Sequence, residues 1–217
     1  KIRAIFNMAI ADGKIPVTDN PFLTYKIKHG IVNKERLSIT EIAKIEKLDL
    51  PVTQKIHHVR NAFIFAFYAA GMRVSDVLML KWRNIRDGKL SYIMIKTKKQ
   101  HSFTLPKQAV AILDQYDRGE PDDFVFPFMT YRVNLDDPKI RHDQLSAKTA
   151  FLNKKLKEIA SKAEIDMNIT THTARHSFAD YARQNSDNLY NLSKTLGHSS
   201  LAVTQNYLAA FDEKAVD

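Results

Sequence analysis

The sequence predicts an α+β fold, in which a mostly helical domain carries one small antiparallel sheet. Apolar residues recur at helical spacing in several segments, and the longest of these covers about residues 53–70. Two short strand-like segments, residues 90–95 and 101–105, enclose a polar tip at residues 96–100, which is typical of a β-hairpin. These two observations favour helices packed around a single hairpin.

The first 36 residues contain one short helical pattern and little other apolar sequence. Asp12-Gly13 ends that pattern, which is formed by Ile2, Ile5, Phe6, Ala9 and Ile10. Asn20-Pro21 then opens an extended, basic stretch that runs to Arg36. This segment has too few apolar residues to form a domain alone, because a stable domain needs a larger buried core.

The chain from Leu37 onward is predicted to form one continuous domain. Ser38 or Thr40 can cap its first helix, which runs through Leu48. The long apolar helix of residues 53–70 follows. Its apolar character predicts that it lies in the core of the domain.

A turn is predicted after the long helix. Gly71 ends that helix and Arg73 lies in the turn, after which Ser75 can cap a helix through Trp82. Asp87-Gly88 is a turn signal in front of the hairpin. Further helices are expected near residues 107–117, 144–163, 173–184, 188–196 and 200–210, with Gly197 after the fourth.

The composition favours a nucleic-acid partner. The chain has 33 Lys and Arg against 24 Asp and Glu, a formal net charge of +9, and compact chains this basic commonly bind polyanions. Residues 81–101 contain seven Lys or Arg and one Asp, and residues 139–162 contain seven against two acids. A Lys-rich helix such as the second segment is more often a solvated face.

Other classes of protein are excluded by what the sequence does not contain. The chain has no Cys, which excludes a disulfide framework, a thiolate nucleophile and a Cys-ligated metal centre. No apolar run approaches the ~20 residues that span a membrane. We therefore expect a cytoplasmic protein with no membrane partner.

Five signals that can carry chemistry follow one another along the chain. They are Gly71-Met72-Arg73-Val74-Ser75-Asp76, the Lys96 hairpin, His172-Thr173-Ala174-Arg175-His176, Leu196-Gly197-His198, and Tyr207. Two Arg side chains can clamp the non-bridging oxygens of one phosphodiester and stabilise charge that develops there. A tyrosine phenol becomes a useful nucleophile only when nearby cations and a base lower the cost of its ionisation.

This ordered set resembles the tyrosine recombinases, also called lambda-type or phage integrases, over about residues 37–207. The segments Arg175-His176-Ser177-Phe178-Ala179 and Thr204-Gln205-Asn206-Tyr207 are most similar to integrases of phages and conjugative mobile elements. The resemblance implies the DNA breaking–rejoining fold. It also implies that residues 37–217 are the catalytic domain, and that residues 1–36 are the tail of a core-binding helical domain plus a linker.

The resemblance further assigns roles to six residues: Arg73, Lys96, His172, Arg175, His198 and Tyr207. Tyr207 would be the nucleophile, and the two Arg would clamp the phosphate. The two His would hydrogen-bond the phosphate or the Tyr, and Lys96 would protonate the leaving 5′ oxygen. Lys98 and Lys99 are close enough to Lys96 to compete for that role. Together with Arg73 and Arg175, they are expected to bind DNA.

Several neighbouring residues admit other interpretations. His172 and His176 have the i, i+4 spacing of helical metal ligands, but no clear acidic ligand lies nearby in the sequence, so we expect no metal and no other cofactor. His176 is expected to be a core residue or to support the site from behind. Tyr181 and Tyr190 match no nucleophile of the family, and Asp76 stands where many relatives have Glu.

The resemblance implies a site-specific recombinase that integrates or excises a mobile element through a 3′-phosphotyrosine intermediate. The expected partners are double-stranded attachment sites and three further copies of the chain, which form a tetramer on DNA from a free monomer. Accessory DNA-bending proteins are further candidates, and DNA-bound protein would associate with the nucleoid. Two alternatives stay open: a type IB topoisomerase-like enzyme, which reseals the same strand, and a non-catalytic DNA-binding relative.

Overall fold

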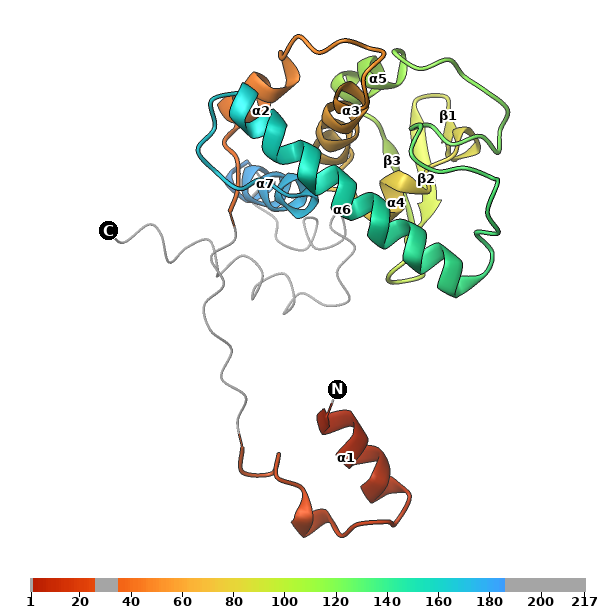
Figure 1. Cartoon of the computed structure of the whole chain (residues 1–217), viewed down its shortest axis with the longest axis vertical. Coiled ribbons are helices and arrows are strands. Elements are labelled where there is room, and N and C mark those ends of the chain that lie inside the picture. The colour runs from red at the N-terminus through yellow and green to blue at the C-terminus, as the bar shows by residue number, and fades with distance from the viewer. Residues whose placement is uncertain (1, 26–34, 186–217) are drawn as a thin grey trace. The chain divides into compact units, whose positions relative to one another are not determined.

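The computed structural model describes residues 2–25 and 35–185, and the chain divides into two compact units, Lys1–Val32 and Asn33–Asp217 (Figure 1). The first unit contains helix α1 (Ile2–Ala11) and a short 3₁₀ helix, Val17–Asp19. The rings of Phe6 and Phe22 meet edge to face at 5.9 Å. No residue of α1 is buried, and residues 2–25 therefore contain no buried core.

In its described residues, the second unit consists mainly of helices with one small antiparallel sheet, which confirms the predicted α+β class. Its helices are α2 (Ile39–Glu46), α3 (Lys55–Tyr68), α4 (Val74–Leu78), α5 (Lys107–Leu113), α6 (Pro138–Lys162) and α7 (Thr171–Gln184). Its strands, β1 (Ile85–Arg86), β2 (Lys89–Ile93) and β3 (Gln100–Thr104), form an antiparallel sheet in the order β1-β2-β3. The short strand β1 was not predicted from the sequence.

Helix α3 is the centre of this unit, as its apolar sequence predicts. Eleven of its 14 residues are buried, and α2, α5, α6 and α7 all pack against it. Figure 1 shows the long helix α6 crossing in front of α3, with the sheet to one side. A helix that is apolar on most of its circumference is stable only in such a central position.

A network of buried polar side chains ties α3 to its neighbours. The His57 ring lies with Nδ1 3.2 Å from the carbonyl oxygen of Leu50 and Nε2 3.1 Å from the Asn61 amide. Arg60 donates to Asn61 and to the carbonyl oxygen of Glu46 at 2.7 and 2.6 Å. These bonds compensate the burial of a cation and an imidazole inside an apolar core.

Two helix starts differ from the sequence-based prediction. Helix α6 begins at Pro138 and not near residue 144, because Asp137 Oδ1 accepts hydrogen bonds from the N–H groups of Lys139 and Ile140 at 2.8 and 3.0 Å. Helix α4 has Arg73 at its N-cap, with Ser75 inside the helix, and it ends at Leu78. The start of α2, in contrast, agrees with the prediction: Ser38, one of the two predicted caps, forms a capping box with Glu41.

Within the described part of the chain, no helix has both the length and the apolar character needed to cross a membrane.

Candidate active site

The structure describes four of the six residues to which the sequence assigned catalytic roles: Arg73, Lys96, His172 and Arg175. His198 and Tyr207 lie outside the described residues, as does the competing Tyr190. The helices expected near 188–196 and 200–210 also lie outside them.

The turn after α3 packs against Arg175 of α7, two residues before Arg73. Gly71 has φ +66° and donates its N–H to the carbonyl oxygen of Phe67 at 3.3 Å, while its own carbonyl oxygen accepts a bond from Arg175 Nη1 at 2.8 Å. A Cβ atom on Gly71 would lie only 3.2 Å from Arg175 Cγ and 3.3 Å from Arg175 Cα. Glycine is thus required both for the left-handed backbone and for the close approach of α7.

Arg73 follows this turn by two residues and lies beside the end of β2. Its Nη1 is 3.3 Å from the sulfur of Met94, which is buried. Arg73 itself is partly exposed, whereas Arg175 keeps only 8% of its surface exposed. The Arg175 guanidinium is therefore held within the fold by a backbone oxygen, whereas Arg73 is partly open to solvent.

Asp76, one turn into α4, connects the arginines to the hairpin. Its Oδ1 accepts a hydrogen bond from the N–H of Ile95 at 2.8 Å, and among the described residues its buried Oδ2 receives none. Burial raises the pKa of this carboxyl, while the Ile95 bond and the positive charges of Arg73, Arg175 and Lys98 act in the opposite direction. Asp76 thus links α4 to the hairpin by one hydrogen bond, and its carboxyl lies within electrostatic range of the three cations.

The hairpin tip presents the predicted lysines to solvent. It is closed by hydrogen bonds between Met94 and the other side of the turn: its N–H donates to Lys99 O at 2.9 Å and its carbonyl oxygen accepts from Lys98 N at 2.8 Å. Lys98 adopts a left-handed φ of +57°. The side chains of Lys96, Lys98 and Lys99 are exposed, so they are free to reach a ligand outside the fold.

His172 lies at the surface in the first turn of α7. The start of the helix is fixed by α6, because Asn153 Oδ1 accepts a bond from the N–H of Thr171 at 2.9 Å. Partial burial of the ring lowers the pKa of His172, and the charges of Arg175, Lys96 and Arg73 lower it further. The charges of Arg175, Lys96 and Arg73 therefore all act on His172, and they favour its neutral imidazole near pH 7.

The neighbouring His176 lies one turn along α7, with its ring centroid 6.4 Å from that of His172. Across residues 2–25 and 35–185, no group of three His, Cys, Asp or Glu side chains is arranged to hold a metal ion.

Sequence reasoning missed two further residues near the arginines. Tyr92 on β2 faces His101 on β3 across the sheet, and the Tyr92 hydroxyl lies 3.3 Å from His101 Nδ1. Burial raises the pKa of Tyr92 and lowers that of His101, and Arg175 and Arg73 lower both values. The alternation of Leu90, Tyr92 and Met94 on one face is the signal that could have found Tyr92, and His101 is its cross-strand partner on β3.

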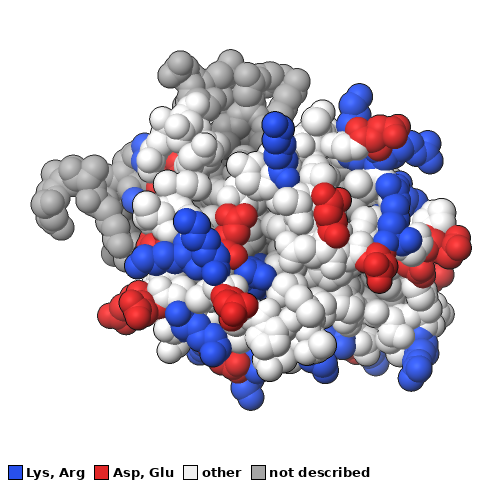
Figure 2. Space-filling view, turned by 90° about the horizontal axis from the view of Figure 1, so that it is seen from above, with Lys and Arg blue, Asp and Glu red and all other residues white. Residues whose placement is uncertain are grey.

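Despite the net positive charge of the chain, parts of its surface carry basic and acidic side chains together. Figure 2 shows one face of the molecule with basic and acidic side chains intermixed. The basic residues ahead of β1 are partly neutralised, since Lys81 and Arg83 both pair with Asp122, at 3.2 and 2.7 Å. A surface of alternating sign binds a polyanion less well than a basic one.

Comparison with known proteins finds sequences similar to this chain among the recombinases. The family model of the phage integrase family matches residues 35–214. Tyrosine recombinase XerD of Listeria innocua is 31% identical over 222 residues, which cover 95% of this chain and 68% of that protein. XerD of Pseudomonas putida is 31% identical over 157 residues, covering 68% of this chain and 48% of that protein.

A solved structure has the same fold. It is a lambda integrase tetramer bound to a Holliday junction, with a TM-score of 0.61, 21% identity, and coverage of 92% of this chain and 56% of that chain. The present chain spans about half the length of several curated relatives, as the 48% coverage of the P. putida protein illustrates.

Proposed function

This chain belongs to the phage integrase family of tyrosine recombinases, and on that premise we propose that it is the catalytic part of a site-specific DNA recombinase. The observation that carries the proposal is the approach of α7 to the Gly71 turn, which brings Arg175 to the segment that bears Arg73. His172 and the Lys96 hairpin lie in the same electrostatic environment. Residues 37–217 would be the catalytic domain, and residues 1–36 would end a core-binding domain and form the linker.

The two arginines would bind the non-bridging oxygens of the scissile phosphate. Negative charge on these oxygens grows in the pentacoordinate transition state, and fixed donors aimed at such charge stabilise it without reorganisation. The loss of one donor of this kind typically raises the barrier by ~3 kcal/mol. Arg175 suits this role because its guanidinium is held by the Gly71 carbonyl oxygen before any substrate binds.

The covalent step would use Tyr207. Its phenolate oxygen attacks the phosphorus, the bond to the 5′ oxygen breaks, and a 3′-phosphotyrosyl bond forms. Lys96 would give the leaving 5′ oxygen its proton, while His172 and His198 would hydrogen-bond the phosphate or the tyrosine. The 5′-hydroxyl of a partner strand would then attack the phosphotyrosine and restore Tyr207, so the exchange needs neither ATP nor a metal.

The partners follow from this chemistry. Strand exchange between two duplexes uses four cleavage sites, so we propose a homotetramer on double-stranded attachment sites that forms from free monomers. The lambda integrase tetramer on a Holliday junction supports this assembly. Integration or excision of a mobile element, accessory DNA-bending proteins, and a cytoplasmic location with nucleoid association complete the proposal.

The test is covalent capture of DNA. A labelled duplex that carries the attachment site and a nick near the cleavage point should give a protein–DNA band on denaturing gels. Tyr207→Phe should abolish this band and leave non-covalent binding nearly unchanged, because only the nucleophilic oxygen is removed. Tyr190→Phe is the matched control and should retain the band.

A band that survives in Tyr207→Phe would contradict the assignment of the nucleophile. Relaxation of supercoiled DNA with no recombinant product would favour the topoisomerase-like alternative. Binding without a covalent product would favour a non-catalytic relative.

A further inference from the structure

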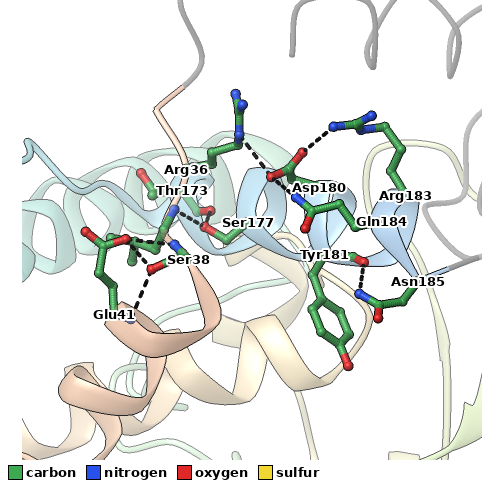
Figure 3. Close-up of polar contacts among 11 residues, drawn as sticks. Arg36, Ser38, Glu41, Thr173, Ser177, Asp180, Tyr181, Arg183, Gln184 and Asn185 are labelled. Atoms are coloured by element: carbon green, nitrogen blue, oxygen red, sulfur yellow. Dashed lines mark hydrogen bonds and ion pairs between the residues drawn. The ribbon is translucent and has the colours of Figure 1, made fainter. Parts of the chain in front are cut away.

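The backbone that leads into the catalytic unit is fixed residue by residue. We call residues 36–38 the connector (Figure 3). Arg36 Nε forms an ion pair with Asp180 Oδ2 at 3.0 Å. The N–H of Leu37 donates to Ser177 Oγ at 2.8 Å, while the Leu37 side chain is buried in the core. Ser38 then caps α2.

Asp180 is the polar centre of this contact. Besides Arg36, its carboxylate accepts bonds from Arg183 Nη2 at 3.2 Å and from Gln184 Nε2 at 2.9 Å. Its side chain is only 11% exposed. One largely buried carboxylate therefore holds both the connector and the last turn of α7, and charge-assisted bonds in such surroundings are stronger than those on an open surface.

The connector contacts the face of α7 that points away from Arg175. At about 100° of rotation per residue, the stripe formed by Thr173, Ser177, Asp180 and Gln184 lies roughly 140–200° around the helix from Arg175. Arg175 is itself held on the other face by the Gly71 carbonyl oxygen and by the close approach of its Cα atom to Gly71. Helix α7 is thus fixed from both sides.

We propose that Asp180, through its ion pair with Arg36, is a positioning residue that keeps α7 pressed against the Gly71 turn and so fixes Arg175. The proposal rests on the proposed function for its catalytic consequence. When the ion pair is lost, α7 loses part of its support on one face, and the distance between Arg175 and Arg73 is less well fixed. Since catalysis by bound charges depends on their placement to fractions of an ångström, the effect should appear in the chemical step and not in DNA affinity.

The first experiment separates these two quantities. Single-turnover rates of covalent complex formation are measured at saturating nicked duplex, together with the Kd for the same DNA. Arg36→Ala should lower the rate about tenfold and change the Kd by less than about twofold, because binding draws on many phosphate contacts. Arg36→Lys should recover much of the rate, since a cation again faces Asp180.

Two further variants serve as controls. Lys155→Ala removes one cation from the ion pair with Glu158 on α6, at 2.8 Å, and should change neither quantity. Asp180→Asn removes the charge from the other side of the ion pair. The double variant Arg36→Ala with Asp180→Asn should be no slower than the slower single variant, because both changes break the same interaction.

The second experiment does not depend on activity. Hydrogen exchange of the peptide covering residues 171–184 should be faster in Arg36→Ala than in wild type, by at least about threefold at the last turn of α7. A weaker Kd with an unchanged rate at saturation would make Arg36 a DNA contact and overturn the proposal. Unchanged exchange would also overturn it. If the wild type forms no covalent complex, the proposed function is wrong, and the exchange result alone decides whether Asp180 holds α7.

Discussion

Replacement of Gly71 with alanine should destabilise the protein through two separable effects. The backbone at Gly71 has φ +66°, and alanine is strained in this left-handed region. The new Cβ would also lie 3.2 Å from Arg175 Cγ and 3.3 Å from Arg175 Cα, so that α7 would have to shift by a few tenths of an ångström. The second effect acts directly on the residue proposed to bind the phosphate.

Gly88 allows the two effects to be measured separately. It has nearly the same φ, +69°, but no atom lies within 4 Å of a Cβ built on it. Gly88→Ala should therefore lower the free energy of unfolding by the backbone strain, about 1–2 kcal/mol. A stiffer unfolded chain offsets up to about 1 kcal/mol of this loss. Gly71→Ala carries the same two contributions and also the crowding, which typically costs about 1–3 kcal/mol. The difference between the variants should equal the crowding alone.

The assay is urea unfolding of both variants beside covalent complex formation at saturating DNA. We expect Gly71→Ala to be less stable than Gly88→Ala by about 1–3 kcal/mol and to form the complex at least about tenfold more slowly. Gly88→Ala should keep nearly the wild-type rate. Equal stability and equal rates for the two variants would refute the argument that close packing at Gly71 positions Arg175.

Two other outcomes follow from the hairpin and from the buried core. Lys96→Ala should slow cleavage by ~10²-fold or more, and a substrate with sulfur at the bridging 5′ position should restore the rate, because a thiolate leaves without a proton. Lys99→Ala, the control, should cleave at nearly the wild-type rate. Equal defects in both variants, without rescue by sulfur, would show that the whole hairpin tip only contacts phosphate. Burial and the charge of Arg60 lower the pKa of His57 in the folded protein. As the pH falls, the His57 imidazole is therefore protonated in the unfolded chain before it is protonated in the folded protein. The free energy of unfolding should accordingly fall as the pH drops below about 6.5. His57→Gln should flatten that decline in urea titrations from about pH 7.5 to 5, and an unchanged slope would contradict it.

Local signals in the sequence were sufficient for most elements of the fold. The apolar run of residues 53–70 predicted the central helix α3, and the segments around residues 96–100 predicted the β2–β3 hairpin. The start of α6 was readable from Asp137-Pro138, a capping residue followed by proline at the first helical position, but the prediction began the helix near residue 144. The cap predicted at Ser75 was wrong because Arg73 precedes the first turn of α4.

The arrangement of the site was less accessible from the sequence. Arg73 and Arg175 were identified by resemblance, since spacing along the chain cannot show that two segments this far apart pack together. The close approach at Gly71 depends on the missing side chain there and on the packing of α7. The contact between Arg36 and Asp180 gave no local signal, because ion pairs between distant segments have no sequence period.

The structure holds the proposed catalytic groups to different degrees, and the proposed chemistry gives a reason for the difference. Arg175 is buried and bonded to a backbone oxygen, as suits a donor that must be in place before charge develops on the phosphate. Lys96 is exposed on a tight turn, which suits a proton donor that is needed only when the leaving oxygen departs. The rigid part of the site depends on helix α7, whose two faces are held by Gly71 and by Asp180. A variant that loosens either face should therefore lower the rate at which DNA is cut before it lowers the affinity with which DNA is bound.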